Sequence, residues 1–220
     1  GGGGMVLAMG ICAALVEVAK SGKGQIIDSA MTDGSALLMS MMYGFYSAGI
    51  WNDHRGSNLL DGAAHFYGCY ECKDNKFVSI GSIEPQFYQE LIKRLEVDEE
   101  TFKDQMDRSK WPKLKKILEK KFKEKTREEW CEIMEGGDVC FAPVLSLEES
   151  INYKHNKDRE TFVNIDGVTQ PAPAPRFSNT PGKIKHPPVR KGENTREILK
   201  SIGKEDLVQE LIESKIISEG

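Results

Sequence analysis

One carboxylate of this chain lies where a predicted strand gives way to a predicted helix. Glu84 stands in the stretch SIGSIEPQFYQE, between Ile83 and Pro85. The pattern over Pro85–Leu95 predicts a helix with its apolar residues on one face. A helix N-terminus stabilises a negative charge by about 0.3–1 kcal/mol. Glu84 is therefore either an acid that caps the helix, or an acid that pairs with an imidazole or guanidinium from another segment or subunit.

Four histidines are the other residues that could exchange protons near neutral pH. His54 and His65 flank a polar loop and are better candidates than His155 and His186, which are expected at the surface. None of the four lies in a recognised triad motif, so a non-catalytic role is favoured for each. The sequence also lacks the P-loop, GxGxxG, HExxH and GxSxG motifs.

The five cysteines give little support for a metal site. Cys69 and Cys72 form a CxxC pair, but Cys131 and Cys140 do not have the spacing of a second zinc-ligand pair. An odd number of scattered cysteines is typical of reduced thiols. We therefore expect no metal and an intracellular compartment.

Composition is that of an ordinary soluble globular protein, with 39% hydrophobic and 29% charged residues. The net charge of -4 argues against a nucleic-acid partner, because such proteins are usually basic. By our reading no apolar run reaches the roughly 18 residues of a membrane span, so we expect no membrane partner. The opening GGGGM runs straight into a helical pattern. We expect these glycines to end a loop, and the chain to be a fragment of a longer protein.

Periodicity divides the chain into an α/β layer, a middle region and a terminal arm. The layer is predicted to hold a buried helix over Met5–Lys20, a strand over Gln25–Asp28 and a helix from Ser29 to about Tyr46. The middle region is predicted to hold a site loop or linker at Trp51–His65, a hairpin of Phe66–Cys72 and Phe77–Ile80, helices at Pro85–Leu95 and from Trp111, capping boxes at Thr126–Glu129 and Ser146–Glu149, and an edge strand in Val139–Leu145. Proline-dense Pro171–Pro188 predicts an extended arm, followed by helices over Thr195–Ile202 and Glu205–Lys215.

Three stretches together resemble the α-methylacyl-CoA racemases of the class III CoA-transferase (CaiB/BaiF) superfamily. They are GKGQIIDSAMTDG (22–34), RGSNLLDGAAHFY (55–67) and IGSIEPQFY (80–88). IEPQFY is the most specific stretch and points to the racemase branch. The stretches EEWCEIMEGGDVCFAPVLSLEE and PAPAPRFSNTP continue the match in order, so the resemblance covers essentially the whole chain.

The resemblance implies an α/β fold class: part of a large, Rossmann-like α/β domain, plus a smaller α+β domain. Residues 1–54 would belong to the large domain and residues 55–170 to the small one. Residues 171–220 would form a proline-rich arm and helices that return to the large domain. Members of this family form an interlocked homodimer.

The implied reaction is racemisation at C2 of a 2-methylacyl-CoA thioester. One base removes the α-proton, an enolate forms, and a second acid returns a proton to the other face. Family members use a histidine, and an aspartate in a GDFGGG-like segment; neither group is present in this chain. The resemblance implies no cofactor, since CoA is part of the substrate, and it implies that this fragment alone is inactive.

The resemblance also carries over individual site residues. Glu84 matches the family glutamate that hydrogen-bonds the catalytic histidine from the partner subunit's small domain. Leu60, Tyr67 and Ile83 match apolar positions around the acyl chain, and Met31 falls near the same pocket. Gly1 and Gly2 are substrate-binding candidates for another reason, since the N–H groups at the start of the first helix can hold an oxyanion. The family usually reads LDGGAPFY where this chain reads LDGAAHFY. The replacements Ala63 and His65 bear on loop shape and substrate choice.

Two other functions stay open. The first is a CoA transferase that works through an aspartyl-CoA intermediate on the same fold. The second is a non-catalytic truncated homologue that acts as an assembly or binding partner. The family occurs in peroxisomes and mitochondria and in bacterial cytoplasm, so the resemblance implies an intracellular protein.

Overall fold

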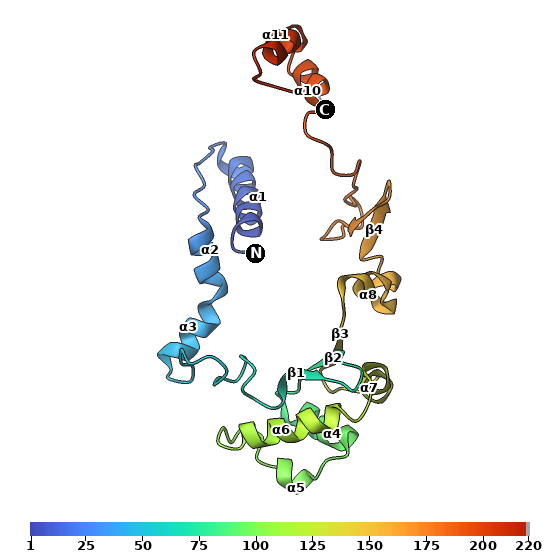
Figure 1. Cartoon of the computed structure of the whole chain (residues 1–220). Coiled ribbons are helices and arrows are strands. Elements are labelled where there is room, and N and C mark those ends of the chain that lie inside the picture. Colours follow the sequence, from blue (N-terminus) through green and yellow to red (C-terminus); the bar gives the residue numbers. More distant parts are fainter. Residues whose placement is uncertain (219–220) are drawn as a thin grey trace. The chain divides into compact units, whose positions relative to one another are not determined.

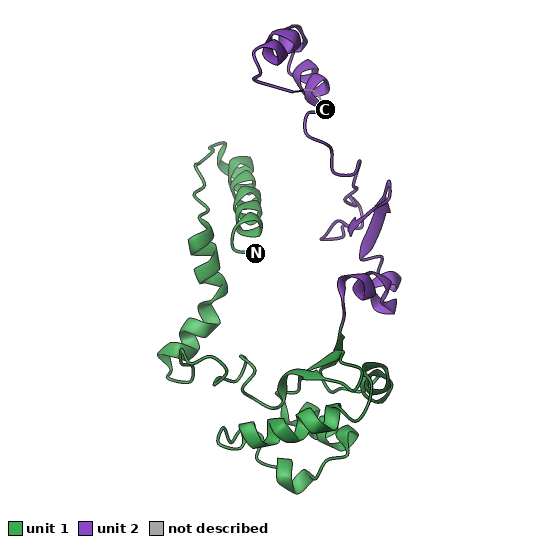
Figure 2. Cartoon of the chain, in the orientation of Figure 1, with its two compact units in different colours: residues 1–144 green, residues 145–220 purple. Residues whose placement is uncertain are grey.

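The computed structural model describes residues 1–218 and combines helices with short antiparallel sheets (Figure 1). It divides into two compact units, Gly1–Val144 and Leu145–Gly220 (Figure 2). The mixture of helix and sheet agrees with the predicted class. The Rossmann-like character of the first segment, the domain boundaries after residues 54 and 170 and the interlocked dimer stay predictions.

The first helix, α1 (Gly4–Ser21), confirms the predicted apolar helix and its glycine end. Gly22 adopts a left-handed φ of 71°, and its N–H donates to the Val18 carbonyl oxygen. The predicted burial of this helix is wrong, because none of the α1 residues is buried. The expectation that no segment is long and apolar enough to cross a membrane is also wrong, because the 18 residues of α1 meet both criteria by length and composition. A core helix of a soluble protein meets the same two criteria.

The strand predicted at Gln25–Asp28 is absent, and this segment forms no ladder. A strand needs a neighbour to receive its hydrogen bonds, and none of the described strands pairs with these residues. The helix predicted to Tyr46 is divided into α2 (Met31–Leu38) and α3 (Ser40–Ser47), with the break at Met39.

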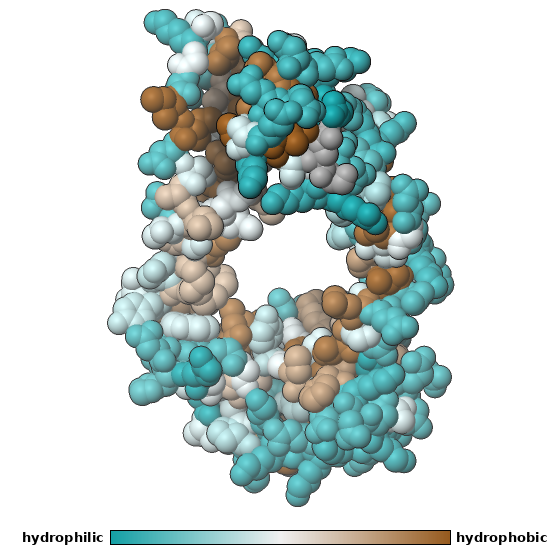
Figure 3. Space-filling model, turned by 45° about the horizontal axis from the view of Figure 1, so that its top comes forward, coloured by the Kyte–Doolittle hydropathy of each residue, from teal (hydrophilic) through white to brown (hydrophobic). Residues whose placement is uncertain are grey.

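The first fifty residues leave much apolar surface in solvent. Only Gly34 is buried among them, while Met5 is 75% exposed, Leu38 66% and Ile26 98%. Hydrophobic patches reach the molecular surface in Figure 3. Apolar surface of this extent is typical of a segment that is covered by another surface in the working protein.

A three-stranded antiparallel sheet forms the centre of the first unit, in the order β1-β2-β3. The strands are β1 (Tyr67–Glu71), β2 (Phe77–Gly81) and β3 (Phe141–Val144). The hairpin predicted around KDN is confirmed, with Asn75 at a left-handed φ of 59°. Pro143 lies on β3 at the sheet edge, as predicted, because proline cannot donate to a ladder.

Four helices complete this unit: α4 (Pro85–Leu95), α5 (Glu99–Phe102), α6 (Trp111–Phe122) and α7 (Arg127–Met134). Their apolar faces share one core with the sheet. The largest fully buried side chains in this core include Phe66, Tyr70, Leu91, Phe102, Leu118, Phe122 and Trp130. The predicted bounds of α4 are confirmed, and so is the capping box that opens α7 at Thr126.

The second unit contains α8 (Leu147–Asn152), α9 (Lys154–Asp158), β4 (Phe162–Ile165), β5 (Val168–Pro171), α10 (Thr195–Ser201), a 3-10 turn η1 (Glu205–Leu207) and α11 (Val208–Glu213). The capping box at Ser146, the extended proline-dense arm and the terminal helices are confirmed. The β4–β5 hairpin was not predicted. Its turn is formed by Asp166 and Gly167, at φ of 50° and 85°.

Candidate functional site

Glu84 is the N-cap residue of α4, but its side chain does not cap the helix. The backbone is extended there, with φ −70° and ψ 140°, and no cap hydrogen bond is made by the side chain. The side chain is exposed, and it takes part in no hydrogen bond or ion pair with any residue that the structure describes. Glu84 therefore makes no capping hydrogen bond, and its charge remains available both to the helix N-terminus and to an outside partner.

Ile83 directly precedes Glu84 in the chain, and Tyr67 lies on the neighbouring strand β1 opposite the end of β2. Tyr67 pairs with Gly81 in the β1–β2 ladder, and its ring lies 3.6 Å from the position that a Gly81 side chain would take. Both Tyr67 and Ile83 are partly buried and pack against the core. Burial and then the negative charge of Glu84 raise the pKa of the Cys140 thiol. Cys140 therefore joins this group, and sequence reasoning did not single it out.

Leu60 belongs to a loop that is organised by one carboxylate. Asp61 accepts hydrogen bonds from the backbone N–H groups of Gly56 (3.0 Å), Ser57 (3.2 Å) and Asn58 (2.9 Å). The Asn58 side-chain amide, which is 1% exposed, donates to it as well, at 2.8 Å. Burial alone would raise the pKa of Asp61, but these hydrogen bonds outweigh it and lower that pKa. The loop that presents Leu60 is thus held by an ionised Asp61.

Replacing Asp61 by alanine is expected to loosen this loop without unfolding the unit. Hydrogen bonds to a charged group contribute about 1.5–3 kcal/mol each, so amide protection at Ser57 and Asn58 should fall by at least about tenfold. Hydrogen exchange read at these amides measures the effect. Asp53→Ala, an exposed acid in the same loop, is the control. Unchanged protection in the Asp61 variant would show that the carboxylate does not organise the loop.

The two replacements in the LDGAAHFY stretch fit the loop. Of its small residues only Gly62 has a left-handed φ, at 92°, and its carbonyl oxygen accepts a hydrogen bond from Lys115 Nζ at 2.5 Å. Ala63 has no positive φ, so a side chain is tolerated there. His65 is completely buried beside Phe66, Tyr88 and Phe102.

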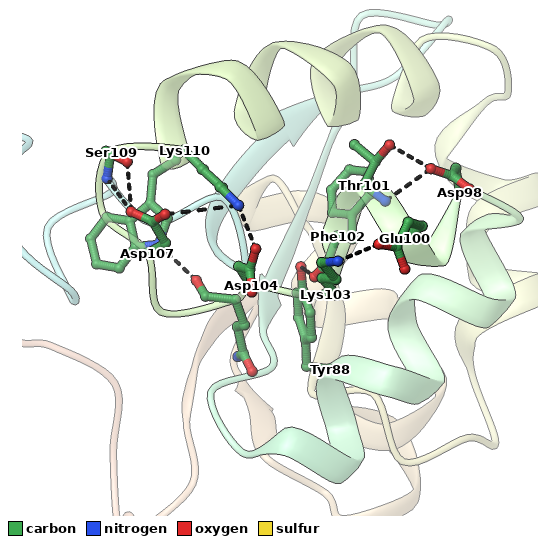
Figure 4. Close-up of polar contacts among 12 residues, drawn as sticks. Tyr88, Asp98, Glu100, Thr101, Phe102, Lys103, Asp104, Asp107, Ser109 and Lys110 are labelled. Carbon is green, nitrogen blue, oxygen red and sulfur yellow. Dashed lines mark hydrogen bonds and ion pairs between the residues drawn. The ribbon is translucent and has the colours of Figure 1, made fainter.

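His65 has a structural role, so its interpretation as the better acid–base candidate is not supported. Tyr88 Oη donates to the Phe102 carbonyl oxygen at 2.9 Å (Figure 4). Its oxygen is then left to accept from His65 Nε2, at 2.7 Å. This assigns the proton to Nε2 and leaves Nδ1 buried, with no hydrogen-bond partner among the described residues. A neutral imidazole thus ties the start of β1 to α4 and α5.

Acidification should lower the free energy of unfolding of the protein, because the buried His65 resists protonation in the folded state. Burial lowers its pKa from 6.5 to about 4, so the unfolded chain binds a proton before the folded chain does. Stability is therefore retained above pH 6.5 and lost as pH falls toward 4, by about 3 kcal/mol. Urea unfolding at pH 7 and pH 5 should show about 2 kcal/mol of this loss in His155→Gln, an exposed-histidine control. His65→Phe should lose less; an equal loss in both variants would contradict the assignment.

The glycines at the chain start lie against α2. A side chain at Gly34 would come within 1.8 Å of the Gly2 carbonyl oxygen, so the two backbones approach too closely for any other residue. A side chain at Gly3 would lie 3.1 Å from Met31 Cγ. Met31 and the glycines are therefore brought together; the placing of Met31 near the acyl-chain pocket stays a prediction. No hydrogen bond of the described residues joins this group to the group around Glu84.

Comparisons with known proteins agree on one family. The chain is 42% identical to α-methylacyl-CoA racemase from Mus musculus over 215 residues, which is 95% of this chain and 56% of that protein. It is also 42% identical to the Homo sapiens racemase, over 98% of this chain and 57% of that protein. Human succinyl-CoA:glutarate CoA-transferase is 23% identical over 226 residues, which is 95% of this chain and 50% of that protein. The chain thus spans little more than half the length of these relatives.

Solved structures support the fold. A CaiB/BaiF family protein from Brucella suis has a TM-score of 0.67 at 20% identity, over 91% of this chain and 54% of that chain. Rv3272 from Mycobacterium tuberculosis has a TM-score of 0.67 at 18% identity, over 87% of this chain and 50% of that chain. The family model described as CoA-transferase family III matches residues 2–195. The chain therefore belongs to CoA-transferase family III.

Proposed function

We propose that the full-length protein racemises 2-methylacyl-CoA thioesters at C2. The observation that carries the proposal is the exposed Glu84, without a partner among the described residues, at the start of α4 beside Tyr67 and Ile83. It stands in a chain that is 42% identical to two proteins named α-methylacyl-CoA racemase. Identity to the CoA-transferase relatives is lower, at 23% for the human protein.

In the proposed mechanism Glu84 accepts a hydrogen bond from an imidazole supplied by residues outside this chain. An adjacent carboxylate favours the protonated imidazole, and so sets the pKa of the group that exchanges the α-proton. Glu84 does not itself touch the α-proton. A second acid, also outside residues 1–220, would return a proton to the opposite face of the enolate.

Binding of the substrate would be divided between two groups of residues. Leu60, Tyr67 and Ile83 would contact the acyl chain, since all three are partly exposed apolar side chains. Met31, Gly1 and Gly2 would lie near the thioester, where backbone N–H groups at the start of α1 can hold an enolate oxygen. The reaction needs no cofactor, because the thioester itself acidifies the α-proton.

We further propose that two copies of the full-length protein interlock, so that Glu84 of one subunit meets the imidazole of the other. The open apolar surface of residues 1–50 supports a large additional interface. The proposed assembly is intracellular, with no nucleic-acid partner.

The proposal is tested by giving the full-length protein one C2 epimer of a 2-methylacyl-CoA. Chiral separation should then show the second epimer growing until the two are equal in amount. An unchanged epimer ratio at high enzyme concentration would rule out racemisation.

A CoA transferase is the second candidate, since the matching family model carries that description. A transferase would form a covalent aspartyl-CoA intermediate, whereas a racemase forms none. Mass spectrometry of the full-length protein quenched with acyl-CoA separates the two: a CoA adduct favours the transferase. A truncated, non-catalytic homologue would give neither an adduct nor a second epimer.

A further inference from the structure

We propose that Gln105 is a positioning residue for Glu84; this inference rests on the proposed racemase function. Gln105 lies between α5 and α6 and is only 8% exposed. Its Nε2 donates to the Ser82 carbonyl oxygen at 3.0 Å and to the Ile83 carbonyl oxygen at 2.9 Å. These are the two consecutive carbonyls that come directly before Glu84.

The amide of Gln105 suits this double contact. A side-chain amide carries two N–H donors on one nitrogen, so one group can satisfy two neighbouring carbonyls. The backbone of Gln105 is itself held in place, since its main-chain carbonyl oxygen accepts a hydrogen bond from Trp111 Nε1 at 2.8 Å. Trp111 is 3% exposed and belongs to the core of the unit. The turn before Glu84 is thereby tied to the core through one side chain.

Other hydrogen bonds also hold the backbone of this turn: Ile83 N donates to the Gly81 carbonyl oxygen at 2.9 Å, and the Glu84 carbonyl oxygen accepts from Tyr88 N at 3.0 Å. Ser82 Oγ donates to the Val139 carbonyl oxygen at 2.7 Å, and Ser82 N donates to the Phe66 carbonyl oxygen at 3.1 Å. After Ile83 the chain enters α4 through Pro85, which has no N–H to donate. None of these bonds reaches the Ile83 carbonyl, which Gln105 binds, so we infer that Gln105 orients the peptide between Ile83 and Glu84 and with it the direction in which the Glu84 carboxylate leaves the backbone.

Displacement of Glu84 would weaken its hydrogen bond to the proposed imidazole. A misplacement of about 1 Å in a catalytic constellation can cost about a hundredfold in rate. We therefore expect Gln105→Met, which keeps the side-chain length but has no donor, to lower kcat of the full-length protein by about 10- to 100-fold. The effect on KM should be less than about threefold, because Gln105 is buried and does not contact the substrate. Gln89→Met, an exposed glutamine on α4, is the matched control with unchanged rate.

A double-mutant cycle separates positioning from general support of the fold. If Gln105 acts through Glu84, then Gln105→Met should lower kcat by less than about twofold when Glu84 is already glutamine. An equal loss in both backgrounds, or no loss in the wild-type background, would overturn the inference. A wild-type protein that does not racemise, or a Glu84→Gln variant with the wild-type rate, would instead defeat the proposed function and this inference with it.

A second variant covers the case in which Gln105→Met does not fold. Gln105→Glu keeps the shape of the side chain, but its ionised carboxylate cannot donate to the two carbonyls. Protonation restores one donor, and burial raises the pKa of such a carboxyl group. The ratio of wild-type to Gln105→Glu kcat should therefore shrink as pH falls from 7 to 5. A ratio that is constant over this range would count against the inference.

Discussion

Replacing Glu84 by glutamine in the full-length protein is expected to lower kcat by about a hundredfold, with KM changed only a few-fold. The amide can still contact an imidazole, but it carries no charge to stabilise the protonated ring. Loss of that charge should lower the pKa of the imidazole, so the acid limb of the kcat/KM profile should move to lower pH. Rates of epimer interconversion between pH 5 and 9 measure both effects.

The control for this variant is Glu128→Gln. Glu128 is an exposed acid in the first turn of α7, so its replacement removes a similar favourable interaction with a helix N-terminus. Both variants should lose no more than about 1 kcal/mol of stability, and only the Glu84 variant should lose activity. If Glu84→Gln keeps the wild-type rate and pH profile, then this carboxylate serves only the helix.

The second large effect is expected from the 220-residue chain alone, which should not exchange the α-proton at all. The proposed mechanism places both proton-transfer groups outside residues 1–220 and gives Glu84 only a hydrogen bond to one of them. The substrate should keep its C2 proton in deuterated water at the rate of buffer alone. The full-length protein at the same concentration is the control. Exchange catalysed by the 220-residue chain would show that a base within residues 1–220 has been overlooked.

Elements with local signals were predicted well. Pro85 at the first helical position and apolar residues on one face were enough to define α4 (Pro85–Leu95). The capping boxes at Thr126 and Ser146 mark helix starts through contacts within four residues, so their sequence pattern is sufficient. The Asp166-Gly167 turn carried a comparable hairpin signal, and it was overlooked.

Features that depend on distant partners could not be predicted in the same way. The apolar stretch Gln25–Asp28 has the composition of a strand, but a strand exists only where a neighbour pairs with it. Gln105 lies in a polar stretch with no periodicity or motif. Its role follows from contacts with carbonyls 22 and 23 residues earlier, which only the folded unit brings together.

The sequence predicted which carboxylate belongs to the site better than it predicted the contacts that this carboxylate makes. Glu84 was singled out by its position before Pro85, and the resemblance favoured a pairing role over a capping role. The structure adds that its side chain makes no cap hydrogen bond. His65 was misjudged as an acid–base candidate, and the loop carboxylate Asp61 was missed. Burial and hydrogen bonding decide the chemistry of both residues, and neither can be read from the sequence.

The central claim is that the full-length protein removes and returns the C2 proton of a 2-methylacyl-CoA. The most direct measurement starts separately from each epimer in deuterated water and follows deuterium at C2 by mass spectrometry with chiral separation. We expect each epimer to yield both epimers, with deuterium at C2 in the inverted product. Retention of the C2 proton and configuration from both starting epimers, with CoA moved to an added carboxylate, would contradict it.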